Sequence, residues 1–166
     1  IENFPKYQKV YNFDVEGNEN YYVTEDGILV HNGYKDELPS RNNVAQGDAG
    51  AYQSRTVGDT EYQISGGGKS VWADGVDDVS NLAQDAKYVG NASRSPFIGD
   101  SNIPPFIRDK IMTNLNDEFS RYSSVINDPS NPIKGLEVIT NNPKAVSTFE
   151  SLMNSHNIPG KVTLIP

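Results

Sequence analysis

The sequence predicts a mixed α/β (α+β) fold, in which helices flank a mixed sheet and a short β-rich segment precedes the main domain. Three strand-like segments, at 60–64, 70–75 and 84–89, follow one helical segment, an order typical of an antiparallel meander. A polar turn at 76–81 separates the last two. Two further strands then alternate with helical segments, which favours parallel β-α-β connections. The 166 residues suffice for one domain with a hydrophobic core.

The first elements of the main domain are a helix and a strand. We expect the helix over 44–57, where apolar residues recur near one face although two glycines weaken it. Polar and apolar side chains alternate over 60–64, as in a half-buried strand. The glycine-rich run 65–69 is predicted to be a hairpin turn. A phosphate-binding loop is disfavoured because Lys69-Ser70 opens a strand, whereas that pair opens a helix in the phosphate-binding motif.

The second half of the chain has the clearest helical pattern. After a polar loop, a long helix is expected to start at Pro104-Pro105 and to run to about Val125 or Ile126, since proline at the first turn pre-sets the backbone angle φ. Its apolar stripe consists of Phe106, Ile107, Ile111, Leu115, Phe119, Tyr122 and Ile126. The strands 136–140 and 160–165 enclose a second helix, 143–156, which an asparagine caps and a proline opens.

Composition excludes several kinds of site. The chain has no cysteine, which excludes disulfides, thiolate zinc sites and cysteine nucleophiles. With only His31 and His156, a histidine-rich metal site is not expected. The net charge of −8 argues against a protein that coats nucleic acid, and no apolar run is long enough for a transmembrane helix. Because the chain starts at Ile1 and has no signal peptide, we expect it to be a piece of a longer protein.

The first 32 residues form a separate segment. Strand-like runs at 10–16, 21–23 and 28–30 alternate with turn signals, so periodicity alone predicts a small β-meander. The strings that run from Val10 to Asn18, from Tyr21 to Val23 and from Gly27 to Asn32 resemble the C-terminal end of a Hint domain.

In bacterial polymorphic toxins that end precedes the toxic tip, and its His-Asn pair supports cleavage next to the asparagine. The family's N-terminal nucleophile is absent here, so we expect no self-processing. The resemblance implies a Hint remnant at 1–32, a linker at 33–43 and a toxin domain at 44–166.

Two acidic residues and one lysine are the candidate reactive groups. Strand 70–75 carries Asp74, and strand 84–89 carries Asp85 and Lys87, which share a face because strand side chains alternate. A hairpin would bring Asp74 close to both, on a face that we expect to be wet. Carboxylates suit Mg²⁺, and the lysine can orient water or stabilise developing charge. The structural alternatives are a turn at Asp74 and an exposed ion pair between Asp85 and Lys87.

These residues and their order resemble the restriction-endonuclease (PD-(D/E)xK) fold, and more narrowly the restriction-endonuclease-fold toxins. The strings that carry the resemblance are Ala51-Tyr52-Gln53, Glu61-Tyr62, Ala73-Asp74-Gly75 and Asp85-Ala86-Lys87-Tyr88-Val89. The resemblance implies that Asp74 and Asp85 bind a divalent metal, Mg²⁺ or Mn²⁺, and that Lys87 positions or activates water. Gln53 and Glu61 are candidates to complete the site, with a structural role for Glu61 equally open. Ala73 stands where the motif has proline.

Basic residues are candidates for contact with the substrate. Arg94, in the loop before the long helix, is a candidate phosphate contact, and a solvated surface arginine is the favoured alternative. Arg108, Lys110 and Arg121 lie off the apolar stripe of that helix, where they face either substrate or solvent.

The function expected from these resemblances is that of a metal-dependent nuclease toxin acting on DNA in competition between bacteria. An RNase that cleaves tRNA is an alternative on the same fold, and a non-enzymatic binding tip is another. The resemblance implies secretion as the tip of a larger toxin, action in the cytoplasm of the target bacterium, and a cognate immunity protein. A serine hydrolase is disfavoured because the chain has no Gly-x-Ser-x-Gly motif.

Overall fold

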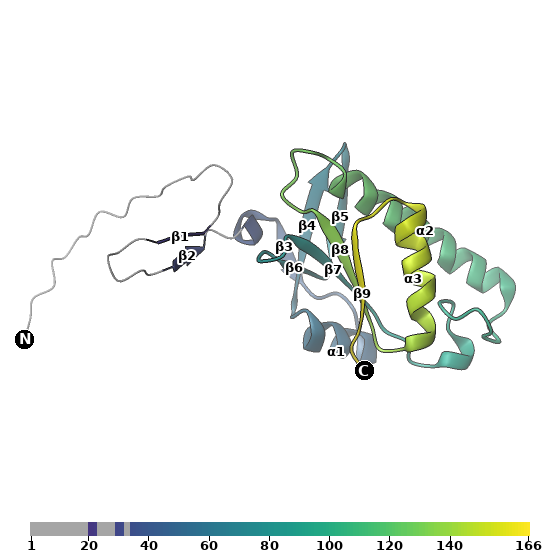
Figure 1. The fold of residues 1–166 in the computed structure, drawn as a ribbon. Helices are drawn as coiled ribbons and strands as arrows, with labels where there is room; N and C mark the ends of the chain where they lie inside the picture. Colours follow the sequence, from purple (N-terminus) through teal and green to yellow (C-terminus); the bar gives the residue numbers. More distant parts are fainter. Residues whose placement is uncertain (1–19, 23–28, 32–33) are drawn as a thin grey trace, which may run out of the picture. The chain divides into compact units, whose positions relative to one another are not determined.

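The computed structural model describes residues 20–22, 29–31 and 34–166, and the chain divides into two compact units, Ile1–Gly33 and Tyr34–Pro166 (Figure 1). In the first unit, β1 (Asn20–Tyr22) and β2 (Leu29–His31) pair antiparallel. The strand expected at 10–16 lies outside the described residues. No helix in the described ranges is both long and apolar enough to cross a bilayer.

The strands of the second unit form two sheets. The first contains β3 (Ser40–Asn42), β4 (Thr60–Gly66) and β5 (Lys69–Ala73), all antiparallel. The second has the order β6 (Gly75–Asp77), β7 (Leu82–Lys87), β8 (Gly135–Thr140) and β9 (Gly160–Leu164). β6 and β7 are antiparallel, whereas the pairs β7–β8 and β8–β9 are parallel. The predicted mixed α/β class is therefore confirmed.

Three α-helices accompany the sheets: α1 (Gly47–Thr56), α2 (Pro105–Ile126) and α3 (Pro143–Ser155). Short 3-10 helices occur at η1 (Tyr34–Glu37) and η2 (Ala92–Arg94). α2 connects β7 to β8, and α3 connects β8 to β9, so the predicted β-α-β connections are present. Asn142 caps α3 by accepting a hydrogen bond from the amide of Lys144.

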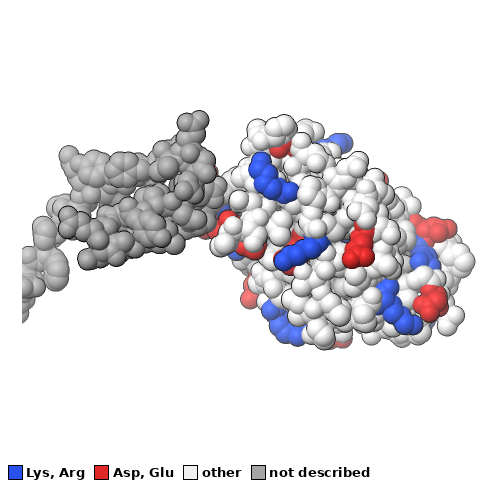
Figure 2. All heavy atoms as spheres, in the orientation of Figure 1, with Lys and Arg blue, Asp and Glu red and all other residues white. Residues whose placement is uncertain are grey.

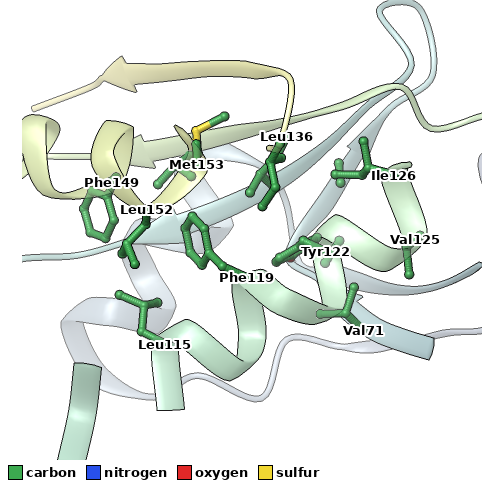
Figure 3. Close-up of a cluster of buried hydrophobic side chains, with 14 of the residues drawn as sticks. Val71, Leu115, Phe119, Tyr122, Val125, Ile126, Leu136, Phe149, Leu152 and Met153 are labelled. Carbon is green, nitrogen blue, oxygen red and sulfur yellow. The ribbon is translucent and has the colours of Figure 1, made fainter. Parts of the chain in front are cut away.

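The core lies between the helices α2 and α3 and the two sheets, since the buried cluster includes residues of β4 and β5 as well as of β7 and β8. Figure 3 shows Leu115, Phe119 and Tyr122 along one side of α2, in the same cluster as Phe149 and Leu152 of α3. Side chains alternate between the two faces of β7, and β8 pairs with it in parallel register, so that Asp85 lies beside Val138 on the same face. This face of the sheet belongs to the core, which includes Val138. Of the apolar stripe predicted for the long helix, Leu115, Phe119, Tyr122 and Ile126 belong to this core, whereas Phe106 and Ile107 are exposed.

The strand expected at 70–75 is interrupted at Asp74. β5 ends at Ala73 in the first sheet, and β6 begins at Gly75 in the second. β6 therefore includes the start of the turn that the sequence predicts at 76–81. Any Cβ at Gly75 would meet the side chain of Val57 at 2.9 Å, so only glycine fits this close approach of chain segments. Asp74 consequently lies at the junction of the two sheets.

The first helix begins at Gly47 rather than at Val44. The backbone amides of Val44 and Ala45 donate to the side chains of Glu61 and Asn43, respectively. Because these two backbone amides bond to side chains while their segment is not helical, helix α1 starts later than expected.

The segment expected to be a linker at 33–43 contains regular structure. η1 lies within it, and β3 pairs with β4 at the edge of the first sheet. The compact unit therefore begins at Tyr34. All three β3 residues are exposed, so this strand has no buried face and no apolar alternation by which the sequence could predict it.

Candidate active site

Asp74 is held against the strand that carries the other two candidate residues. Its Oδ2 atom accepts a hydrogen bond of 2.7 Å from the backbone amide of Ala86. Ala86 lies between Asp85 and Lys87 on β7, so this one bond fixes the Asp74 carboxylate beside both. Burial raises the pKa of Asp74 above its ordinary value, and the nearby Lys87 ammonium opposes that rise. The structure thus brings together the three residues that the sequence singles out.

Asp85 is buried, with 2% of its surface exposed, so the face expected to be wet is covered. Its Oδ1 atom lies 2.7 Å from Nζ of Lys87, and its Oδ2 atom has no hydrogen-bond partner among the described residues. Burial raises the pKa of Asp85 to about 6, with Lys87 opposing the rise and the Asp74 charge adding to it. A buried carboxylate oxygen without a partner is costly, and a site for a bound ion is one of its ordinary explanations.

Lys87 joins β7 to α2. Its Nζ atom contacts Asp85 and also lies 3.1 Å from Oε2 of Glu118 on α2. Burial by itself lowers the pKa of the Lys87 ammonium, but the carboxylates of Asp85, Glu118 and Asp74 raise it above its ordinary value. Lys87 therefore carries its positive charge throughout the neutral pH range.

Glu118 is a member of the site that the sequence analysis missed. Its pKa is raised, first by burial and then by the charge of Asp85. A signal was present in the sequence, because Glu118 lies three residues after Leu115 and four before Tyr122, both of which are buried. That spacing places an acidic side chain beside the core-facing stripe of α2.

Glu61 is the centre of a second polar cluster next to these residues. It is 3% exposed, and its Oε2 atom accepts from Nε of Arg41 and pairs with Nη2 of the same guanidinium, both at 2.6 Å. Its Oε1 atom accepts from the amide of Val44 at 3.0 Å and from Nε2 of Gln53 at 3.4 Å. The guanidinium of Arg41 also lies 4.0 Å from the centre of the Trp72 ring. Both Glu61 oxygens are thus engaged by the protein, in an arrangement that positions Arg41.

A cavity of about 440 Å³ opens onto both clusters. Its lining includes Arg41, Gln53, Glu61, Trp72, Asp74, Ala86, Lys87, Glu118 and Arg121. Asp85 is not among the lining residues, but it contacts Lys87, which is one of them. Arg94 is exposed on η2 and does not line the cavity, so its role as a phosphate contact stays a prediction. The volume of this cavity lies within the range of small-molecule binding sites, which is roughly 300–1,000 Å³.

The two aspartates fit a divalent cation in their chemistry. Asp74 and Asp85 offer oxygen ligands of the kind that Mg²⁺ and Mn²⁺ prefer, and the unpartnered Oδ2 of Asp85 is available to accept one. Over residues 34–166 and the two short described strands, no group of three or more histidine or acidic side chains forms a ready-made metal cluster. A cation bound here would need water or substrate oxygens to complete its coordination, as is usual for Mg²⁺.

The charge on the surface is mixed. Figure 2 shows acidic and basic side chains interspersed on one face of the second unit, with no continuous basic band. Together with the net charge of −8, this pattern differs from that of proteins that track a long stretch of phosphate backbone.

Comparison with known proteins gives one match. The sequence model of a family described as "Restriction endonuclease fold toxin 2" matches residues 48–159, which is more than half of the chain. Neither the curated proteins nor the solved structures contain a match. The matched range contains Asp74, Asp85, Lys87 and Glu118, and it begins after Arg41.

Proposed function

The chain belongs to the restriction endonuclease fold toxin 2 family, and from this we propose that it hydrolyses phosphodiester bonds of DNA with the help of Mg²⁺ or Mn²⁺. Membership of a restriction-endonuclease-fold toxin family supports a nuclease toxin. The observation that carries the proposal is the convergence of Asp74 and Lys87 on one cavity, with Asp85 in contact with Lys87.

Asp74 and Asp85 are the residues that would hold the cation. When bound, a divalent cation supplies Lewis-acid stabilisation of negative charge on the phosphate and lowers the pKa of water. The backbone amide of Ala86 holds the Asp74 carboxylate in place for this task.

Lys87 acts as a cation in this proposal. The neighbouring carboxylates raise the pKa of the Lys87 ammonium and so favour its charged form. In that form it can donate hydrogen bonds to a phosphate oxygen or to water and stabilise the charge that develops in the transition state. In the hydrolysis, a water oxygen bonds to phosphorus and gives up one proton to solvent, one P–O ester bond breaks, and the departing oxygen takes a proton from solvent.

Membership of a toxin family supports a proposal about the biological setting. We propose that the domain is delivered as the tip of a larger secreted protein and acts in the cytoplasm of a competing bacterium. A producer of such an enzyme needs protection, so a cognate immunity protein is part of the proposal. The cavity over Lys87 is the surface that such a protein would have to cover to block substrate.

The test is cleavage of supercoiled plasmid and of total tRNA, with Mg²⁺ and with EDTA in excess. Wild type is compared with Asp85→Asn and Lys87→Ala, and with Lys110→Ala as a control that removes an exposed lysine of α2 outside the cavity. We expect plasmid cleavage that EDTA abolishes, that both site variants lose and that the control keeps. Cleavage of tRNA alone would replace DNA by RNA as the substrate. No cleavage of either by folded wild type would overturn the nuclease proposal and favour a binding tip.

A further inference from the structure

A second cavity adjoins the candidate active site. It measures about 360 Å³ and is lined by Phe97, Ile111, Asn114 and Leu115 together with Lys87, Glu118 and Arg121. The last three residues also line the first cavity, so the two cavities meet at a shared wall. When a nucleic acid substrate places one phosphate over Lys87, the neighbouring nucleotide is therefore within reach of the second cavity.

The lining of the second cavity differs from that of the first. Three of its side chains are apolar, and Asn114 adds one amide group that can both donate and accept hydrogen bonds. The Phe97 ring is fixed by its contact with Phe149, with 5.1 Å between the ring centres. An aromatic and aliphatic wall with one amide is the chemistry that proteins use to hold a base outside a double helix.

Arg121 stands at the wall that the two cavities share. Its side chain is exposed, and within residues 34–166 it has neither a hydrogen bond nor an ion pair. An exposed guanidinium that has no hydrogen bond or ion pair within residues 34–166, beside a cavity that carries Lys87, is placed to contact a phosphate. The backbone of a strand would then pass Arg121, with the attached base in the cavity beyond.

We infer that the second cavity binds one unpaired nucleobase next to the phosphate that is cleaved, so the substrate is single-stranded or locally unpaired. This inference rests on the proposed nuclease function. The net charge of −8 supports it, because an acidic chain depends on a few local contacts and on stacking rather than on many phosphates.

The first test is binding in EDTA, where cleavage does not interfere. Trp72 is the only tryptophan of the chain and lines the first cavity, so its fluorescence reports ligands at the site. We expect a single-stranded oligonucleotide to bind at least about tenfold more tightly than the blunt duplex of the same sequence, as one stacked base accounts for about that factor. Equal affinity for the two forms would overturn the inference.

A matched pair of variants locates the base. Asn114→Asp places a carboxylate in the second cavity, whereas Thr113→Asp places the same charge on an exposed neighbour that lines neither cavity. We expect only Asn114→Asp to weaken binding of the single strand, again about tenfold or more. Equal effects of the two variants would show a general charge effect and contradict the assignment.

Cleavage of oligonucleotides with one abasic position separates this inference from the nuclease proposal. If the cavity holds a base, cutting of a given bond is lost when the base at one fixed distance from it is missing, and is kept when a more distant base is missing. Cutting that ignores the abasic position would overturn the base site while leaving the nuclease function standing. If nothing is cut, the nuclease proposal fails, and the binding measurements still decide whether the cavity holds a base.

Discussion

The Nζ atom of Lys87 lies 3.1 Å from Oε2 of Glu118, so the long helix α2 supplies a direct partner to the lysine of β7. The same ammonium contacts Oδ1 of Asp85 at 2.7 Å. The carboxylates of Asp85 on β7 and of Glu118 on α2 therefore fix the position of the Lys87 ammonium at the edge of the cavity. α2 is thus part of the candidate site as well as of the core.

We expect Glu118→Gln to reduce the rate of cleavage roughly 10- to 100-fold, the range seen when an outer partner of a reactive group is removed. Glutamine keeps an acceptor for Lys87 but removes the charge that helps to hold it. The measurement is kcat and KM on a nucleic acid substrate, with the melting temperature as a check on folding. Asp117→Asn is the control, because this exposed acid lies outside both cavities. Equal rates for wild type and Glu118→Gln would contradict a positioning role.

Removal of divalent cations provides a second prediction. If Asp74 and Asp85 hold the cation, Mn²⁺ or Mg²⁺ at 100 times its dissociation constant stabilises the protein by about 2.7 kcal/mol and raises its melting temperature by roughly 5–10 °C. Differential scanning fluorimetry with added metal, and then with EDTA, measures this shift. Asp85→Asn should show almost no shift, whereas the exposed Asp109→Asn should behave as wild type. A full shift in Asp85→Asn would place the cation elsewhere.

Glu61 provides a prediction that separates a structural role from a direct one. Glu61→Gln removes the charge that pairs with Arg41 and exchanges one acceptor oxygen for a donor group. We expect a loss of about 1–3 kcal/mol in the free energy of unfolding, because Glu61 is buried while Arg41 is partly exposed. Urea denaturation measures it, with the exposed Glu150→Gln as control. Loss of cleavage with unchanged stability would instead assign Glu61 a direct part in the reaction.

Local patterns predicted the parts of the site that depend on one strand or one helix. The alternation of side chains over β7 placed Asp85 and Lys87 on one face. The apolar stripe predicted the long helix α2, which runs from Pro105 to Ile126 in the structure. The expected turn back to β7 predicted that Asp74 lies close to Asp85 and Lys87. The strand expected at 70–75 is, however, interrupted at Asp74, where the two sheets meet.

The remaining features depend on packing between distant elements. Asp85 is buried in the folded chain, and no local pattern along β7 shows that distant elements cover it. Arg41 meets Glu61 only because β3 pairs with β4, and the exposed β3 has no strand pattern of its own. Such contacts join residues 20 or more positions apart, and the sequence shows the residues without showing the contact.

A last prediction concerns Glu137, which lies on the opposite face of the second sheet from Asp85. Its carboxylate accepts hydrogen bonds from Thr163 at 2.6 Å and from Gln84 at 2.9 Å, and Lys161 lies 3.1 Å away. Burial alone would raise the pKa of Glu137, but these three partners outweigh it and hold the pKa below the ordinary value of 4.5.

Because the pKa of Glu137 is lower in the folded chain, the unfolded chain binds its proton more tightly. The stabilisation is complete above about pH 4.5 and is lost as the pH falls through the folded value. We expect Glu137→Gln to cost about 1–3 kcal/mol at pH 7, since its new amide group faces donors, and to lose less stability than wild type between pH 5 and 3. Urea denaturation across this range measures both effects. Lys161→Met, which removes only the exposed partner, should cost less than about 1 kcal/mol. If acid lowers the stability of Glu137→Gln as steeply as that of wild type, Glu137 does not contribute to the acid sensitivity of the fold.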